Sequence, residues 1–369
     1  MWLRRNLYPH ILTLRLSIQE NATSEREGWS SQVDLSVSTC VPFVKSVARE
    51  IDEVPAQLAE TSQYDNRASM MMNNRFLAVM LALFAIPACG SQAQDSTEKL
   101  CVPDNQAVWD STSKAWMDEL KSEQFGSWPQ QPISEKTKTL FSVKHEGVAL
   151  KAIEFQTREG STARLYIAGR DGLENFDLVV LSPVDQKGWQ EFVATYRVGF
   201  EKQLATGNAP AADKKSFGQT ARMFHSFKWA MAYLRLPTEV ENRNACSNRT
   251  CELRRAIQTL RSAGGMKDVS LWLQGTGDTS AVVLFASLFE PKVTRLDLYD
   301  LPLDGSEKAA RLITGSSLSM QGLVAMAAQK SKVVIYQDEK SGWEYPQSVV
   351  EKLNWGKNLQ IRGLPQFDE

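Results

Sequence analysis

Histidine is scarce in this chain of 369 residues, in which it occurs only as His10, His145 and His225. Since histidine is the usual general base for a serine nucleophile, few positions can supply one. No apolar run reaches the length that a relaxed helix needs to cross about 30 Å of hydrocarbon, so we expect no transmembrane span. The 42 lysine and arginine residues nearly balance the 43 aspartate and glutamate residues. Without a basic field to attract phosphates, nucleic acid is not an expected partner.

Cysteine is also sparse, and its spacing argues against a metal site. Cys246 and Cys251 form a lone C-x4-C with neither a second pair nor a neighbouring histidine to complete a tetrahedral shell. Cys40 and Cys89 precede the expected mature chain, whereas Cys101 remains in it. Because export permits disulfides, we expect one between Cys246 and Cys251, at the start of a helix.

A secretory signal is indicated far from the first residue, in residues 70–93. A short basic region, thirteen mostly apolar residues (Phe76 to Ala88) and then small residues follow one another there. Cleavage after Ala93 is expected. A lipid anchor at Cys89 is the alternative, which Pro87 disfavours. The pattern therefore predicts an exported protein, either periplasmic or extracellular.

The signal divides the chain into parts of different character. Residues 1–69 carry little sustained periodicity, and we interpret them as a mis-assigned start or a disordered extension. Residues 94–140 hold one amphipathic helix, from Asp104 to about Glu123, followed by an extended linker that contains prolines. Residues 141–369 are expected to form the globular domain.

Short strands alternate with helices in this last part. The expected strands are Phe141–Val143, Leu150–Phe155, Ala163–Ala168, Phe176–Leu181, Val269–Leu273, Val293–Tyr299 and Lys332–Tyr336. The expected helices are Trp189–Ala205, Gly218–Tyr233, Cys251–Ala263, Thr279–Phe289, Ser319–Gln329 and Pro346–Leu353. Right-handed crossovers then predict an α/β fold, with a mostly parallel sheet and helices on both faces. Several tryptophans fall where these elements would bury them, namely Trp109, Trp116, Trp189, Trp229 and Trp272.

The turn Gly275-Thr276-Gly277-Asp278-Thr279 follows a buried strand, where parallel sheets gather ligands and catalytic groups. Its spacing resembles the nucleophile elbow G-x-S-x-G, but Gly277 occupies the nucleophile position. A phosphate loop would need a lysine that is missing. A dinucleotide fingerprint would need a third glycine or alanine, so no cofactor is expected.

A displaced nucleophile is the alternative interpretation of this turn. Thr276 or Ser280 could supply the hydroxyl, His225 the base and Asp338 the acid, since Asp338 follows a late strand. An α/β-hydrolase, however, delivers its histidine after the last strands, and no histidine follows the turn. His225 fits a partly buried helix residue better than a base. The sequence therefore predicts impaired catalysis, and an active serine esterase stays open as the alternative.

Six segments carry a resemblance to a known family: Trp189–Phe192, Arg197–Phe200, Cys251–Arg261, Lys267–Gly275, Leu284–Pro291 and Arg295–Pro302. They resemble the C-terminal lobe of exported bacterial proteins named as acetyl xylan esterases, of the type found in planctomycetes. The resemblance implies an α/β-hydrolase fold and, in active members, removal of acetyl groups from plant-type polysaccharides. Ala205–Lys215 is interpreted as a degraded central strand. We expect an esterase-like binding or structural lobe, with a polysaccharide or an esterase as partner.

Overall fold

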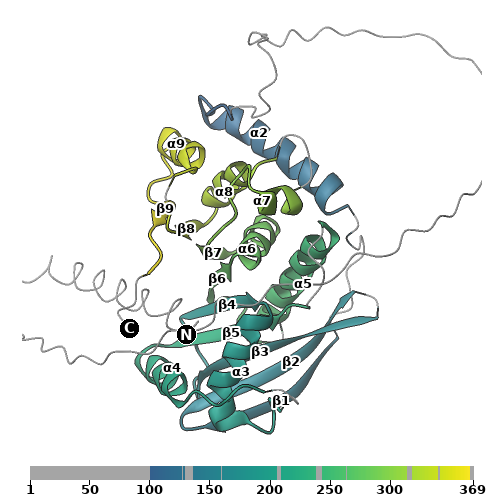
Figure 1. The fold of residues 1–369 in the computed structure, drawn as a ribbon, viewed down its shortest axis with the longest axis vertical. Coiled ribbons are helices and arrows are strands. Elements are labelled where there is room, and N and C mark those ends of the chain that lie inside the picture. The colour runs from purple at the N-terminus through teal and green to yellow at the C-terminus, as the bar shows by residue number, and fades with distance from the viewer. Residues whose placement is uncertain are drawn as a thin grey trace, which may run out of the picture. The chain divides into compact units, whose positions relative to one another are not determined.

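The computed structural model describes residues 100–126, 128, 136–158, 160–205, 209–237, 243–262, 264–313, 318–339 and 341–365. The predicted extension at 1–69 and the predicted signal at 70–93 lie outside these residues. Across the described ranges, no helix has the length and apolar character needed to cross a membrane. The described chain forms one mixed sheet with helices on both faces (Figure 1), so the predicted α/β fold class is confirmed.

The sheet contains nine strands in the order β1-β2-β3-β5-β4-β6-β7-β8-β9. The strands are β1 (Thr137–His145), β2 (Val148–Arg158), β3 (Ser161–Arg170), β4 (Leu178–Val184), β5 (Trp229–Arg235), β6 (Ser270–Thr276), β7 (Val293–Tyr299), β8 (Lys332–Tyr336) and β9 (Leu359–Arg362). Pairing is antiparallel from β1 through β3 to β5 and parallel between all neighbours from β5 to β9. The parallel strands therefore share one carboxyl edge, at which ligand sites of such sheets lie.

Eight α-helices occur in the described residues. They are α2 (Gln106–Glu119), α3 (Gln186–Phe200), α4 (Lys214–Ser226), α5 (Arg243–Ser262), α6 (Asp278–Phe289), α7 (Glu307–Leu312), α8 (Met320–Ala328) and α9 (Glu344–Lys352). A short π-helical turn, Leu120–Gln124, continues α2. Each crossover between the parallel strands contains at least one of these helices, as parallel pairing requires.

Strand β5 corrects two predictions. The expected helix Gly218–Tyr233 ends instead at Ser226, and Trp229–Arg235 pairs with β3 and β4. All residues of β5 except the last are buried, so the strand is apolar on both faces and lacks the alternation of a half-buried strand. The central strand is therefore this segment and not a degraded copy in Ala205–Lys215.

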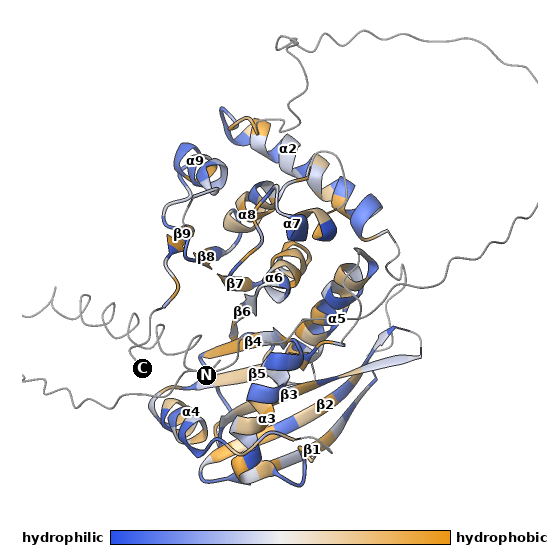
Figure 2. Cartoon of the chain, in the orientation of Figure 1, coloured by the Kyte–Doolittle hydropathy of each residue, from blue (hydrophilic) through white to orange (hydrophobic). Residues whose placement is uncertain are grey.

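Two hydrophobic cores lie on the two faces of the sheet. On one face, α3 presents Trp189, Phe192 and Tyr196 at helical spacing, together with residues of α4. On the other face, α6 is buried from Thr279 to Leu288, and it has mostly apolar colours in Figure 2. Four of the five tryptophans expected in the core are buried, and Trp272 is half-buried. The two cores fix β4 and β6, whose carboxyl ends carry the site described below.

The predicted disulfide is wrong, because Cys246 and Cys251 are both free thiols on α5. Five residues along an ideal α-helix separate two Cα atoms by about 8–9 Å. A disulfide needs Cα atoms within roughly 7 Å. The sequence placed the helix start at Cys251, whereas α5 already runs from Arg243. Burial raises the pKa of the Cys246 thiol to about 12 and also raises that of Cys251.

Candidate functional site

The turn after β6 has the backbone shape of a nucleophile elbow. Gly277 caps α6 with φ 58° and ψ −124°, in the region of positive φ that favours glycine. Its N–H donates to the carbonyl of Tyr299 on β7 over 2.8 Å. No described atom lies within 4 Å of the point where a Cβ of Gly277 would stand. In a nucleophile elbow this position carries the nucleophile, whereas here it is open space beside a glycine.

The residues around Gly277 hold the turn in place. The Thr276 N–H donates to Thr279 Oγ1 over 2.8 Å, and that hydroxyl donates to the Thr276 carbonyl over 2.9 Å. A Cβ at Gly275 would stand 2.6 Å from the Thr279 carbonyl oxygen and 2.7 Å from the Ser280 nitrogen. Glycine at 275 thus allows α6 to cross the end of β6 closely, which explains one half of the G-x-G pattern by packing.

The two candidate hydroxyl groups have different surroundings. Ser280 is fully buried in α6, and its hydroxyl donates to the Gly277 carbonyl. Thr276 is exposed at the end of β6 and lines a pocket. Of the two hydroxyl groups proposed as a displaced nucleophile, only that of Thr276 therefore belongs to a residue at the pocket.

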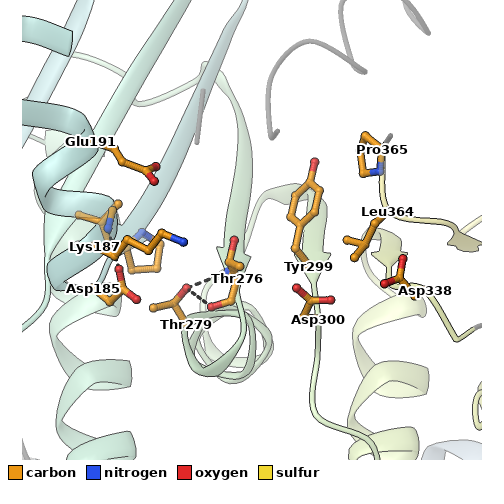
Figure 3. Close-up of a pocket in the computed structure, with 13 residues that line it drawn as sticks. Asp185, Lys187, Glu191, Thr276, Thr279, Tyr299, Asp300, Asp338, Leu364 and Pro365 are labelled. Carbon is orange, nitrogen blue, oxygen red and sulfur yellow. Dashed lines mark hydrogen bonds between the residues drawn. The ribbon is translucent and has the colours of Figure 1, made fainter. Parts of the chain in front are cut away.

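This pocket, which we call the elbow pocket, has a volume of about 450 Å³ at the carboxyl edge of the sheet. Figure 3 shows polar side chains from the start of α3 on one side, the elbow threonines in the middle, and residues at or after the ends of β7, β8 and β9 on the other side. Its labelled lining residues are Asp185, Lys187, Glu191, Thr276, Thr279, Tyr299, Asp300, Asp338, Leu364 and Pro365. The side chain of Lys187 extends toward the elbow in this view.

The charge of the elbow pocket is acidic, because its lining carries four carboxylates and a single ammonium group. The carboxylates are those of Asp185, Glu191, Asp300 and Asp338. Burial raises the pKa of Tyr299 well above its usual value, and the nearby Asp297 carboxylate raises it further. The phenol therefore stays protonated, and its hydroxyl shares a hydrogen bond with Gln274. Such a lining accepts and donates hydrogen bonds to a neutral ligand with several hydroxyl groups and repels an anionic one.

The carboxylates of the elbow pocket do not build a metal centre. Among the residues that the structure describes, no group of three histidine, cysteine, aspartate or glutamate side chains could hold a metal ion. The Asp185 carboxylate accepts the Gly188 N–H over 2.7 Å as the N-cap of α3. The Asp185 carboxylate therefore has a structural partner as well as a place in the lining.

Both described histidines lie at the opposite edge of the sheet. His225 belongs to the last turn of α4, just before β5 begins, and a Cβ at Gly147 in the β1–β2 turn would stand 2.9 Å from its Nε2. His145, at the end of β1, has its ring centroid 6.2 Å from that of Phe200 at the end of α3. His10 lies outside the described residues. No histidine in the described ranges lines the elbow pocket, whereas Asp338 does.

Sequence reasoning missed the α3 side of the elbow pocket. Asp185, Lys187 and Glu191 follow β4, which lies beside β6 in the sheet but about 90 residues earlier in the chain. The sequence does carry a signal for this side. Asp185 follows the buried run Leu178–Val184 directly and is the N-cap of α3, where it accepts the N–H of Gly188. That pattern indicates a strand end at the same edge as the elbow.

Solved structures with this fold include carbohydrate esterases. A candidate acetyl xylan esterase from Bacteroides fragilis NCTC 9343 matches with a TM-score of 0.50 and 10% identity, over 73% of this chain and 79% of that one. A glucuronoyl esterase from Solibacter usitatus matches with a TM-score of 0.49 and 11% identity, over 71% and 89%. No family model matches the chain, and no curated protein sequence matches it. At such low identity, the first match shows a shared α/β-hydrolase-like fold.

Proposed function

We propose that this protein binds a neutral saccharide in the elbow pocket and does not hydrolyse it by the serine mechanism. The observation that carries the proposal is Gly277, which stands at the elbow with φ 58° and ψ −124°. An esterase of this fold attacks the ester carbonyl with a serine hydroxyl at this point, and glycine has no hydroxyl to attack with. The protein is then a catalytically impaired, esterase-like hydrolase fold that serves as a binding lobe.

Two observations support a carbohydrate as the ligand class. The fold is shared with a candidate acetyl xylan esterase, a protein named for a polysaccharide substrate. The elbow pocket combines carboxylates with the hydroxyl groups of Thr276 and Tyr299 at the edge where parallel sheets hold ligands. Carboxylates accept hydrogen bonds from sugar hydroxyl groups, and charge-assisted bonds of this kind are the stronger ones.

An active esterase with a displaced nucleophile is the alternative, and the geometry disfavours it. Ser280 is buried with its hydroxyl bonded to the Gly277 carbonyl. Thr276 reaches the elbow pocket, but His225, the base that it would need, lies at the other edge of the sheet. Asp338 then has no described histidine beside it to orient. A hydroxyl without a base within hydrogen-bond reach is a poor nucleophile.

The test combines ester turnover with saccharide binding by the full chain. We expect no hydrolysis of p-nitrophenyl acetate above the rate of a protein-free blank, and Arg222→Ala, which changes an exposed residue of α4, is the matched control for the variants. Xylotetraose should bind in calorimetry, with affinity lost in a variant that carries Glu191→Ala and Asp338→Ala. Turnover that is abolished by Thr276→Val or by His225→Ala would establish the active alternative. Absence of xylotetraose binding would overturn the binding role.

We also propose that the protein is exported after cleavage behind Ala93. The support is the basic, apolar and small-residue order of residues 70–93. The mass of the mature N-terminus tests this, because Gln94 should then be the first residue. A mature chain that retains residues 1–69 would contradict it, and a lipid mass on Cys89 would support the anchored alternative.

A further inference from the structure

A second pocket, with a volume of about 550 Å³, lies next to the elbow pocket. We call it the arginine pocket; the ends of β2, β3 and β5 and one residue of α5 form it. Its charged and aromatic lining residues are Arg158, Arg164, Arg235, Glu154, Glu252 and Tyr166. Leu236 of this pocket donates its N–H to the carbonyl of Val184, which lines the elbow pocket, over 3.0 Å. A backbone hydrogen bond therefore links one lining residue of each pocket, at the carboxyl ends of the neighbouring strands β4 and β5.

Two of the three arginines already have a carboxylate partner inside the arginine pocket. Arg164 Nε lies 3.2 Å from Glu154 Oε2, so this pair faces across β3 and β2. Arg158 lies 3.9 Å from Glu252 Oε1 and donates to Asn248 Oδ1 over 2.7 Å. These contacts hold the two guanidinium groups in position and leave them locally compensated in charge.

Arg235 differs, because no carboxylate within the described residues forms an ion pair with it. Its Nη2 donates over 3.3 Å to the neutral amide oxygen of Gln186, and its Cζ lies 5.2 Å from the centroid of the Trp189 ring. A guanidinium on an aromatic ring is oriented by it, and its remaining N–H groups can meet a carboxylate in a bidentate way. The arginine pocket thus presents one oriented cation that lacks a counter-ion in the described part of the chain.

We propose that the arginine pocket is a second saccharide subsite, which binds a carboxylate-bearing sugar residue through Arg235. The proposal rests on saccharide binding in the elbow pocket, since both pockets would hold parts of one ligand. The elbow pocket is acidic and repels a carboxylate, whereas the arginine pocket has three guanidinium groups against two carboxylates. Opposite charge in adjoining pockets fits an oligosaccharide with neutral residues at the elbow and a uronate beside it.

The experiment compares two probes that differ by one carboxylate, namely xylotetraose and xylotetraose with a single glucuronic acid branch. Calorimetry with the full chain should give at least about tenfold tighter binding of the acidic probe, the increment of a charged hydrogen bond. Arg235→Ala should remove this difference and leave xylotetraose binding unchanged. Arg235→Lys should keep part of the difference, because lysine retains the charge without the planar fork. Arg222→Ala is the matched control, and a thermal melt of each variant verifies folding.

The possible failures separate this inference from the proposed function. Equal affinity for both probes would overturn the assignment of the arginine pocket as a subsite. Tighter binding of the acidic probe that Arg235→Ala does not weaken would overturn it too. Neither result contradicts saccharide binding in the elbow pocket. If neither probe binds, saccharide binding in the elbow pocket is refuted. The binding of free glucuronate, compared with that of glucose, then tests the arginine pocket by itself. Glucuronate binding lost in Arg235→Ala would then support the arginine pocket alone, and no glucuronate binding would overturn it. Displacement of glucuronate by sulfate at equal affinity would identify a general anion site and overturn the saccharide assignment.

Discussion

Replacing Gly277 by serine puts back the residue type that the elbow lacks, and we expect it to cost stability without creating an esterase. The backbone at φ 58° and ψ −124° is unfavourable for any residue with a Cβ. Strain of this kind costs about 1–3 kcal/mol per residue. No steric term adds to it, since no described atom lies within 4 Å of the new Cβ. The free energy of unfolding should therefore fall by about 1–3 kcal/mol.

Urea denaturation followed by tryptophan fluorescence measures this loss, and Gly275→Ala is the comparison. A Cβ at 275 would stand 2.6 Å from the Thr279 carbonyl oxygen and 2.7 Å from the Ser280 nitrogen, so α6 must shift. Overpacking against backbone should cost about 3 kcal/mol or more. A greater loss for Gly277→Ser than for Gly275→Ala would refute the argument from backbone strain. Turnover of p-nitrophenyl acetate by the serine variant above the wild-type level would refute the claim that a base is missing.

Three further predictions concern parts of the fold away from the elbow. Asp297→Ala should lower the free energy of unfolding by about 3–5 kcal/mol, because it removes the carboxylate 2.8 Å from the buried Arg295 guanidinium. In a double-mutant cycle measured in urea, replacing Asp297 and Arg295 together should cost less than replacing Asp297 alone. A reducing agent should leave the melting temperature unchanged, because Cys246 and Cys251 form no disulfide. A thiol reagent at pH 8 should label these two cysteines only after unfolding. Rapid labelling of the native protein would contradict their burial and raised pKa values. Burial raises the pKa of Asp213, but hydrogen bonds from the first turn of α4 lower it on balance, so the folded pKa lies below the unfolded one. Its stabilisation is then present above about pH 4 and is lost as the pH falls through the folded pKa. Asp213→Ala should accordingly cost about 1 kcal/mol at pH 7 and less at pH 2, as urea titrations at the two pH values would measure.

The elbow could be predicted from the sequence because its signals are local. A buried strand, two glycines and an apolar helix stand next to one another in the chain, and β6 and α6 follow them closely. The glycines are required at this point by close packing at Gly275 and by positive φ at Gly277. Neither requirement depends on distant residues, so a single sequence carries both.

The pockets could not be predicted in the same way, because tertiary pairing assembles them. Arg235 ends β5, a strand buried on both faces whose apolar run has no period of two, so the sequence predicts a helix there. With β5 missing, nothing in the sequence placed Arg158 and Arg164 beside it. The Arg235 side chain then meets Gln186 only because β4 and β5 pair in register, with Val184 opposite Arg235. Long-range register of this kind has no local signature.

The turn after β6 is held by hydrogen bonds and by packing, neither of which needs a side chain at position 277. The Gly277 N–H is bonded to β7, the two threonines bond to each other across the turn, and α6 behind them is buried on all sides. A serine at 277 would have to be strained, whereas glycine holds the same φ and ψ without a Cβ penalty. Glycine at 277 therefore avoids this strain, and the strand-to-helix crossing that borders the elbow pocket does not depend on a side chain there.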